Sequence, residues 1–327
     1  MTELIYSNLN PYNASPLFQE ASGRGVLINP PAFPMTSEEL DLVYSLPYRR
    51  LSHPAYQGGV PALKVVEASI TSHRGCYGAC SFCSISLHQG KFIQSRSEKS
   101  IRGEAEKLAA SGKKTITDVG GPSANMYASF CSDRSAMKNC RRQSCIFPNQ
   151  CQHLKASQKD YSELLKNILS LKGIKNVFIN SGVRYDLALL EESFIRDLAR
   201  CFTPGQLSGA PEHVDDNILK LMGKPLIKVY DDFSAKFYSY SQKAGKSQHL
   251  MPYFIVGHPG ADDKSENKIA TYFRENKIRM RQIQEFYPTP MTISTSIYYT
   301  GQVPFTGELV KSEKKLSVIK KWKGKIL

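Results

Sequence analysis

Three cysteines with the spacing CxxxCxxC follow a segment that is expected to form a β-strand. Cys76, Cys80 and Cys83 stand in the run GCYGACSFC, directly after residues 66–71. Thiolates are the usual protein ligands of iron–sulfur clusters, so a short loop with three of them can hold three irons of a 4Fe–4S cube. The fourth iron then has no protein ligand and is open to a cofactor or a substrate. Glycines within the run let the backbone wrap closely around a cluster.

Zinc is the strongest alternative for these thiols. A structural zinc ion normally has four protein ligands in a closed tetrahedron, and His73 or His88 would have to supply the fourth. We favour a cluster because the loop offers three thiolates by itself. Arg74 and Lys91 are expected to offset the negative charge of the cluster and its thiolates.

Strand-like and helix-like segments alternate along most of the chain. Alternation of this kind predicts a parallel sheet with crossover helices, whose ligands bind at the carboxyl ends of the strands. Ser95 and Glu98 have the spacing of a capping box, and Asp160 is expected to cap a later helix. The predicted strands are residues 66–71, 115–119, 177–179, 206–208, 250–256, 283–286 and 292–299. The predicted helices begin near residue 98 and cover residues 160–171, 187–198, 215–222 and 229–240.

Four further cysteines lie in a loop-rich insertion between residues 124 and 157. They are Cys131, Cys140, Cys145 and Cys151. Four thiolates that come together would bind an auxiliary iron–sulfur cluster or a structural zinc ion, and such a tie would stabilise a segment with little apolar content. Free thiols remain the alternative. Cys201, the eighth cysteine, follows a predicted helix and is expected to be a small core residue.

Composition and charge narrow the class of protein. The chain has 327 residues, 41% of them hydrophobic, and carries eight cysteines and a formal charge of +14. The sequence shows no secretory signal and no apolar run of about 20 residues, so a soluble, cytoplasmic protein without membrane contact is expected. In a reducing compartment cysteines point to metal ligation. The basic residues are dispersed apart from the tail KSEKKLSVIKKWKGKIL, which favours a solvated surface over a nucleic-acid site.

With Phe82 before the last cysteine, the loop matches CxxxCxΦC and resembles the radical S-adenosylmethionine (SAM) superfamily. The run SITSHRGCYGACSFCSISLHQGKFIQSRSEKSI is similar to the YgiQ family within it, as are DVGGPSANMY, CRRQSCIFPNQC, VRYDL, APEH, PYFIVGHPG and FYPTPMTISTSIYYTG in that order. The resemblance extends from about Gly25 to Gly307. Members of the family are longer at both ends, so the chain corresponds to a fragment or to a naturally short form.

The resemblance implies a fold and a chemistry. The expected fold is an α/β partial TIM-like barrel of about six βα units, with the cysteine-rich segment as an insertion. Residues 1–62 would form an N-terminal extension, residues 63–300 the core, and residues 301–327 a basic tail. The expected cofactors are a 4Fe–4S cluster and SAM, which is cleaved to a 5′-deoxyadenosyl radical. A flavodoxin or ferredoxin type of reductant is implied as a partner. The substrate is not identified: RNA or protein, which the positive charge favours mildly, and a small metabolite are the alternatives.

The resemblance also implies which residues bind SAM. Superfamily members place a glycine-rich stretch after the second strand, against the methionine amine, and Gly120 and Gly121 stand there. Pro122 occupies a position where an acidic residue is common, so no carboxylate contact is implied. Ile255 and Gly257, with Val256 between them, lie where the superfamily packs adenine; ordinary core and turn roles are the alternative.

Two further sites follow predicted strand ends. Arg184 would pair with the SAM carboxylate, since its planar fork suits that group, or would form a structural ion pair with Asp186 or Glu191. Glu212 and His213 would face the substrate or belong to a surface loop.

Two other functions remain open at this point. A non-catalytic metalloprotein would bind metal without cleaving SAM. An RNA-binding module would show affinity for RNA that falls steeply with salt and survives the loss of Cys76.

Overall fold

Seven short strands, all paired in parallel, form the centre of the molecule. The computed structural model describes residues 1–279 and 281–327. β3 pairs with β7, β6 with β10, and β12 with both β11 and β13. Their bounds are β3 (Ser69–Thr71), β6 (Thr115–Ile116), β7 (Asp118–Gly120), β10 (Asn176–Val177), β11 (Gln206–Glu212), β12 (His249–Val256) and β13 (Gln282–Glu285). Within the described residues the strands do not close into a barrel.

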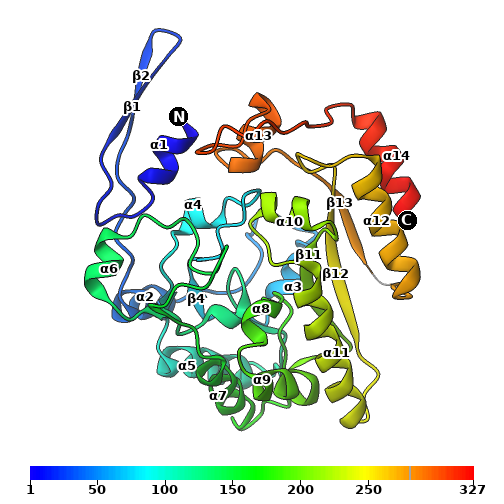
Figure 1. The fold of residues 1–327 in the computed structure, drawn as a ribbon. Coiled ribbons are helices and arrows are strands. Elements are labelled where there is room, and N and C mark those ends of the chain that lie inside the picture. Colours follow the sequence, from blue (N-terminus) through cyan, green and yellow to red (C-terminus); the bar gives the residue numbers. More distant parts are fainter. Residues whose placement is uncertain (280) are drawn as a thin grey trace.

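Helices follow the strands and cover them from outside (Figure 1). In α7 the buried side chains recur at helical spacing, as in Tyr161, Leu164, Leu165 and Ile168, and burial of each aliphatic side chain contributes about 1.5–3 kcal/mol. The covering helices are α5 (Glu98–Ala110), α7 (Gln158–Leu169), α8 (Tyr185–Ala188), α9 (Glu192–Asp197), α10 (Asp216–Met222), α11 (Ile227–Lys243) and α12 (Asp263–Glu275). The predicted alternation of strands and helices is thereby confirmed.

One predicted strand is wrong. Residues 292–299 belong to α13 (Ile293–Thr300), whose first turn is capped by the Thr292 hydroxyl, which accepts a hydrogen bond from the backbone N–H of Thr295 at 3.3 Å. The helix ends at Gly301, which has φ +73°. The β-branched and aromatic residues of this run favour a strand, but a hydroxyl cap at one end and a left-handed glycine at the other decide for a helix.

Several predicted boundaries also shift. The strand expected over residues 66–71 begins only at Ser69, because residues 63–66 form the short helix α3 (Leu63–Val66). The hydroxyl of Ser97, not that of Ser95, caps α5, and Ser157 rather than Asp160 caps α7. Each region holds several residues able to cap a helix, and spacing alone does not choose among them.

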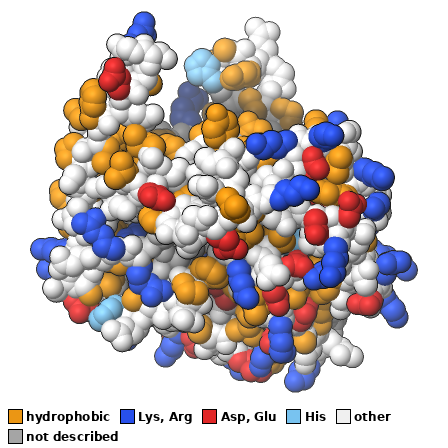
Figure 2. Space-filling view, turned by 45° about the horizontal axis from the view of Figure 1, so that its top comes forward, with side chains coloured by type: hydrophobic (Ala, Val, Ile, Leu, Met, Phe, Trp, Pro, Cys, Tyr) orange, Lys and Arg blue, Asp and Glu red, His pale blue; other side chains and the backbone are white. Residues whose placement is uncertain are grey.

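The N-terminal residues form a separate set of elements on one side of the core. They comprise α1 (Thr2–Ser7), a hairpin of β1 (Leu17–Ala21) and β2 (Arg24–Ile28), and α2 (Ser37–Ser45). The hairpin projects from the body of the molecule (Figure 1). It leaves Phe18, Val26 and Leu27 exposed, and hydrophobic side chains gather around it and at its foot (Figure 2).

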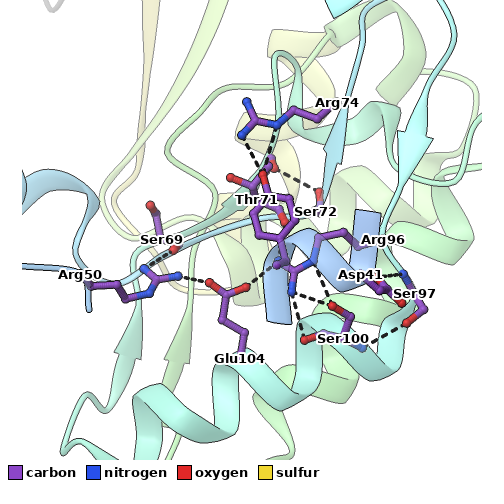
Figure 3. A network of polar contacts seen from close by, with 12 residues as sticks. Asp41, Arg50, Ser69, Thr71, Ser72, Arg74, Arg96, Ser97, Ser100 and Glu104 are labelled. Carbon is purple, nitrogen blue, oxygen red and sulfur yellow. Dashed lines mark hydrogen bonds and ion pairs between the residues drawn. The ribbon is translucent and has the colours of Figure 1, made fainter. Parts of the chain in front are cut away.

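A polar network ties this N-terminal region to the core (Figure 3). Glu104 of α5 lies between two guanidinium groups and pairs with both Arg50 and Arg96. Arg96 is 1% exposed and also donates to the Thr71 carbonyl at 2.8 Å, while Arg50 donates to the Ser69 carbonyl at 2.8 Å. Arg50 and Arg96 therefore bind the carbonyls at the two ends of β3, and both of them pair with the Glu104 carboxylate.

The cysteine-rich segment is an insertion that follows β7. It contains a 3₁₀ turn (Ala124–Met126), α6 (Arg134–Asn139) and the antiparallel pair β8 (Phe130–Cys131) and β9 (Leu154–Lys155). The loop of Cys76 is preceded by β4 (His73–Arg74), which pairs with β5 (Gln94–Ser95), and followed by α4 (Ile85–Gln89).

The basic C-terminal segment contains a packed helix. α14 (Leu316–Ile326) buries Ile319, Trp322 and Ile326 in an apolar cluster with Phe254 and Ile269. Trp322 Nε1 also donates to Asp263 Oδ1 at 2.9 Å. Lys320, Lys321 and Lys325 of this helix are exposed, and Lys323 pairs with Glu285. No helix in the described part of the chain is long and apolar enough to cross a membrane.

Candidate metal and cofactor site

The loop that carries Cys76, Cys80 and Cys83 is anchored on both sides. The backbone N–H of Cys76 donates to the Gly90 carbonyl at 3.0 Å, after α4. The N–H of Ser81 donates to the Met222 carbonyl at 2.9 Å, and its hydroxyl donates to the Leu221 carbonyl at 2.6 Å, at the end of α10. The loop is therefore tied by hydrogen bonds to the residues that follow α4 and to the end of α10.

The three thiols share one half-buried environment. Burial raises the pKa of the Cys76 thiol, while the backbone N–H groups of Gly78 and Ala79 act in the opposite direction. Burial likewise raises the pKa of Cys83 to about 12, and Cys80 and Cys76 are among its charged neighbours. Metal binding must displace these protons. The amides that already point at the Cys76 sulfur then stabilise its thiolate.

The donor set of this loop fits a cluster better than a single zinc ion. Among residues 1–279 and 281–327, no three His, Cys, Asp or Glu side chains are placed to hold one metal ion. The loop itself supplies three thiols, and thiolates are the usual protein ligands of iron–sulfur clusters. A structural zinc ion normally needs a fourth protein ligand, which the loop does not supply.

The basic and histidine residues expected near the loop lie elsewhere. The His73 ring packs on Gly121 and pairs through Nδ1 with the Ser72 hydroxyl at 2.9 Å, and His88 lines a cavity beside the N-terminal region. Arg74 donates to the Tyr44 hydroxyl, and Lys91 donates to Cys140 Sγ at 3.3 Å, in the second cysteine group. In the structure, Arg74 and Lys91 make their polar contacts away from the loop's three thiols.

Arg184, for which the sequence leaves two roles open, lies beside the cysteine loop. Its Nε and Nη2 donate to the two carboxylate oxygens of Asp186 at 3.0 and 2.6 Å. Its Nη1 lies 3.7 Å from Cys80 Sγ. Burial opposes ionisation of Asp186, but Arg184 outweighs it and holds the pKa of that carboxyl below its usual value. The predicted ion pair with Asp186 is therefore present, and it lies directly against the cysteine loop.

Gly120 and Gly121 lie at the end of β7, as expected. Gly120 pairs with Thr71, the last residue of β3, so both glycines stand beside the strand that leads to the cysteine loop. A Cβ on Gly120 would clash with Ser181 Oγ, and one on Gly121 would lie 2.6 Å from the His73 ring. The chain itself thus approaches both glycines closely, which explains why neither carries a side chain.

We expect Gly121→Ala to lower the free energy of unfolding by about 1–3 kcal/mol, because the new methyl group must displace a buried imidazole. Gly103→Ala is the matched control: Gly103 lies inside α5, and a methyl group added there would meet no atom within 4 Å. It should gain roughly 0.5–1 kcal/mol from helix propensity. Chemical denaturation of the two variants measures both effects. Equal stability of Gly121→Ala and the native chain would contradict the close packing.

Phe82 and Ile255 meet in one apolar cluster near the end of β12. Ile255 is buried there beside Met222 and Phe286, and Phe82 packs against the same cluster. The Phe82 ring also makes an edge-to-face contact with His258, with ring centroids 6.4 Å apart. The structure thereby brings the aromatic residue of the cysteine loop to the strand end where adenine was expected.

Gly257 forms a turn with φ +78°, and its N–H donates to Glu266 Oε1 at 2.7 Å. Burial raises the pKa of Glu266 to about 7, although the Gly257 amide acts against this shift. Between pH 4.5 and 7 the unfolded chain therefore ionises this carboxyl while the folded chain does not. The group's contribution to stability is present below pH 4.5 and is lost as the pH rises to about 7.

Glu266→Gln should remove this pH dependence. The stability of the variant relative to the native chain should rise between pH 4.5 and 7 by up to about 1.4 kcal/mol per pH unit, and level off above pH 7. Urea denaturation at a series of pH values measures the difference. A difference that stays constant across this range would show that Glu266 ionises normally in the folded protein.

Other polar residues at the strand ends are buried. Glu212 and His213 do not belong to a surface loop: Glu212 has φ +73° and burial raises its pKa to about 7, while burial lowers the pKa of His213 to about 4. Asp118 was not predicted from the sequence; its Oδ1 accepts from the N–H groups of Asn180 and Ser181 at 2.7 and 2.9 Å. Its place two residues before Gly120, at a strand end, was a signal that could have identified it.

The second cysteine group is only partly assembled. Cys140 and Cys151 lie close enough to Cys145 to act on it electrostatically. The Cys131 thiol instead donates to the Asp133 carbonyl at 3.4 Å. Cys201 is exposed, so its expected place in the core is wrong. It lies in the π-helical turn Leu198–Phe202, where the wider turn puts Phe202 on the buried side instead.

Two cavities flank the cysteine loop. A cleft of about 1220 Å³ adjoins Ala79, Ser81 and Arg184 and contains the basic residues Arg141, Arg142, Lys220 and Lys224. A more apolar cavity of about 970 Å³ lies between the N-terminal elements and the residues around α4. Ala79 and Ser81, which lie between Cys76 and Cys83 in the chain, line the cleft but not the other cavity.

Comparison with known families identifies the class of protein. The family described as "Radical SAM superfamily" matches residues 70–272, preceded by "Radical SAM N-terminal" over residues 1–69 and followed by a domain of unknown function, DUF3362, over residues 281–327. The chain belongs to the radical SAM superfamily. The prediction of an α/β radical SAM core is thereby confirmed, as are a 4Fe–4S cluster and SAM as the cofactors of the family.

The relatives narrow the resemblance to the UPF0313 proteins. A UPF0313 protein of Methanocella arvoryzae is 44% identical over 308 residues, which cover 94% of this chain and 51% of that protein. The UPF0313 protein YgiQ of Shigella flexneri is 42% identical over 316 residues, covering 95% of this chain and 43% of that protein. The resemblance to YgiQ is confirmed, and the chain spans about half the length of the relatives it matches.

The solved structures that the chain matches are more distant in sequence. The radical SAM methyltransferase TsrM from Kitasatospora setae, with cobalamin and a 4Fe–4S cluster bound, is 15% identical, with a TM-score of 0.48 over 85% of this chain and 45% of TsrM. Methylornithine synthase (PylB) is 12% identical, with a TM-score of 0.44 over 90% of this chain and 74% of that enzyme.

Proposed function

We propose that this chain is a radical SAM enzyme in which Cys76, Cys80 and Cys83 hold a 4Fe–4S cluster with one open iron. The observation that carries the proposal is an anchored loop of three thiols next to Gly120 and Gly121, in a chain of the radical SAM superfamily. When bound there, the cluster supplies the electron that cleaves SAM to methionine and a 5′-deoxyadenosyl radical.

The chain's own residues position and neutralise the reactants. The amides of Gly78 and Ala79 stabilise the Cys76 thiolate, and the guanidinium of Arg184 offsets charge at Cys80. Because Asp186 accepts hydrogen bonds from Nε and Nη2 of Arg184, we propose that Nη1, which lies 3.7 Å from Cys80 Sγ, meets the SAM carboxylate. The backbone at Gly120 and Gly121 is proposed to meet the methionine amine.

The adenine end of SAM is proposed to lie against Phe82, Ile255 and Gly257. Support comes from the shared apolar cluster of Phe82 and Ile255 at the end of β12. An apolar surface of this kind excludes water from the position where a radical would be released.

The architecture we propose is a partial barrel of about six βα units, with residues 1–62 as an N-terminal extension, 63–300 as the core and 301–327 as a C-terminal segment. The support is the series of parallel pairings from β3 to β13, with helices between the strands. We further propose a cytoplasmic protein that receives electrons from a flavodoxin or ferredoxin type of donor.

The substrate is proposed to be anionic. Arg141, Arg142, Lys220 and Lys224 line the cleft beside the cysteine loop, and the formal charge of the chain is +14. Modification of RNA or protein is the version that this charge favours. Binding of a polyanion would weaken steeply with salt.

Anaerobic reconstitution with iron and sulfide, followed by dithionite and SAM, tests the proposal. Release of 5′-deoxyadenosine by the reconstituted chain is the expected result. Full cluster assembly without 5′-deoxyadenosine would instead support a non-catalytic metalloprotein with a binding, sensing or structural role.

A further inference from the structure

Three cysteines of the insertion are held together by backbone contacts. Cys151 donates its N–H to the Cys145 carbonyl at 2.7 Å, and the N–H of Cys145 donates to the Tyr77 carbonyl at 3.1 Å. Cys140 forms the C-cap of α6. Cys140 and Cys151 also lie close enough to Cys145 to act on it electrostatically. The three thiols are therefore neighbours in the folded chain.

A buried cation stands beside this site. Lys91 is 6% exposed, and its Nζ donates to Cys140 Sγ at 3.3 Å and to the Arg142 carbonyl at 2.8 Å. Among residues 1–279 and 281–327, no carboxylate forms an ion pair with Lys91. Removing an ammonium from water costs several kcal/mol unless negative charge compensates it. The thiols of this site lose their protons when they bind a metal, and Cys140 lies within reach of Lys91 to supply that negative charge.

We propose that Cys140, Cys145 and Cys151 bind a second iron–sulfur cluster, with Lys91 as its buried counter-cation. The site offers three thiols, which can hold three irons of a cluster, whereas a structural zinc ion normally takes four protein ligands in a closed tetrahedron. Cys131 is not a ligand, because its thiol faces the Asp133 carbonyl.

The second site adjoins the first. Cys76 and the pair Cys145 and Cys151 pack on the same buried cluster, which contains Tyr77, Met126 and Leu154. The proposal does not require SAM cleavage, so it can be tested in a chain that lacks the first site.

The test starts from a variant with Cys76, Cys80 and Cys83 replaced by serine. After anaerobic reconstitution, this variant should retain iron and acid-labile sulfide in equal amounts, together with an electron paramagnetic resonance signal on reduction by dithionite. Adding Cys145→Ser should reduce iron to background, whereas adding Cys201→Ser, at an exposed thiol, should not. Lys91→Met should keep the iron but shift the reduction potential of the remaining cluster to more negative values.

Absence of iron from the folded triple variant, or iron that persists after Cys145→Ser, would overturn the proposal, as would zinc in place of iron. If the triple variant fails to fold by circular dichroism, the native chain provides the test. Its Cys140, Cys145 and Cys151 should react with iodoacetamide only after a chelator removes iron, while Cys201 reacts throughout. Reaction of all four before iron removal would show free thiols.

Discussion

Cys80→Ala is expected to abolish reductive cleavage of SAM while leaving the fold intact. Cys80 is half-buried in a loop that backbone hydrogen bonds anchor at both ends, so loss of its sulfur should not displace the loop. Even removal of an outer-shell partner of a metal ligand lowers affinity or activity by roughly 10–100-fold. Removal of a ligand should therefore lower release of 5′-deoxyadenosine by at least about 100-fold.

Chromatographic measurement of 5′-deoxyadenosine after dithionite reduction provides the readout, with circular dichroism as the check on folding. Cys201→Ala is the control, because this exposed thiol lies outside both cysteine groups. Cleavage at the native rate in the Cys80→Ala variant would remove the assignment of the loop as the cluster site. Iron bound at Cys140, Cys145 and Cys151 would remain in this variant, so total iron alone does not decide the result.

Arg184→Met should cause the largest loss of stability of any single polar substitution proposed. The buried Arg184 guanidinium makes two hydrogen bonds to Asp186, and its removal leaves that carboxylate without its main partner. Breaking a buried ion pair in this way costs about 3–5 kcal/mol. Lys224, another charged neighbour of Asp186, compensates only partly.

Chemical denaturation of the cluster-free protein under anaerobic conditions measures this loss. Replacing Asp186 by Leu in the same chain should restore part of the stability, because no buried charge then remains. Lys228→Met is the control, since Lys228 pairs with Asp232 on the exposed surface of α11 and should show no measurable change. A loss as small as that of the control would mean that Arg184 is not required to compensate Asp186.

The sequence predicted the parts of the structure that depend on local pattern. The cysteine loop after a strand, the glycines after β7 and the long strand β12 all follow from spacing and alternation. The helix over residues 293–300 was missed because its β-branched and aromatic residues favour a strand, and only a single hydroxyl and Gly301 indicate otherwise.

Contacts between distant residues could not be read from the sequence. Nothing near Lys91 shows that its ammonium reaches Cys140, 49 residues away, rather than the first cysteine loop. The same holds for Glu104, which joins Arg50 and Arg96. For Arg184 the sequence left open a contact with SAM or an ion pair with Asp186 or Glu191, and only the folded chain shows the pair with Asp186. These contacts depend on how the elements pack, which no local pattern encodes.

The Tyr77 carbonyl connects the two cysteine groups. It lies next to Cys76 in the chain and accepts hydrogen bonds from the Cys145 N–H at 3.1 Å and the Ser144 hydroxyl at 3.2 Å. When the first loop loosens, the insertion loses these two hydrogen bonds, so we expect opening of the loop to loosen the segment around Cys145 as well. The Cys145 amide proton should consequently exchange with solvent more slowly when metal is bound to the loop of Cys76, Cys80 and Cys83, although Cys145 lies outside that loop.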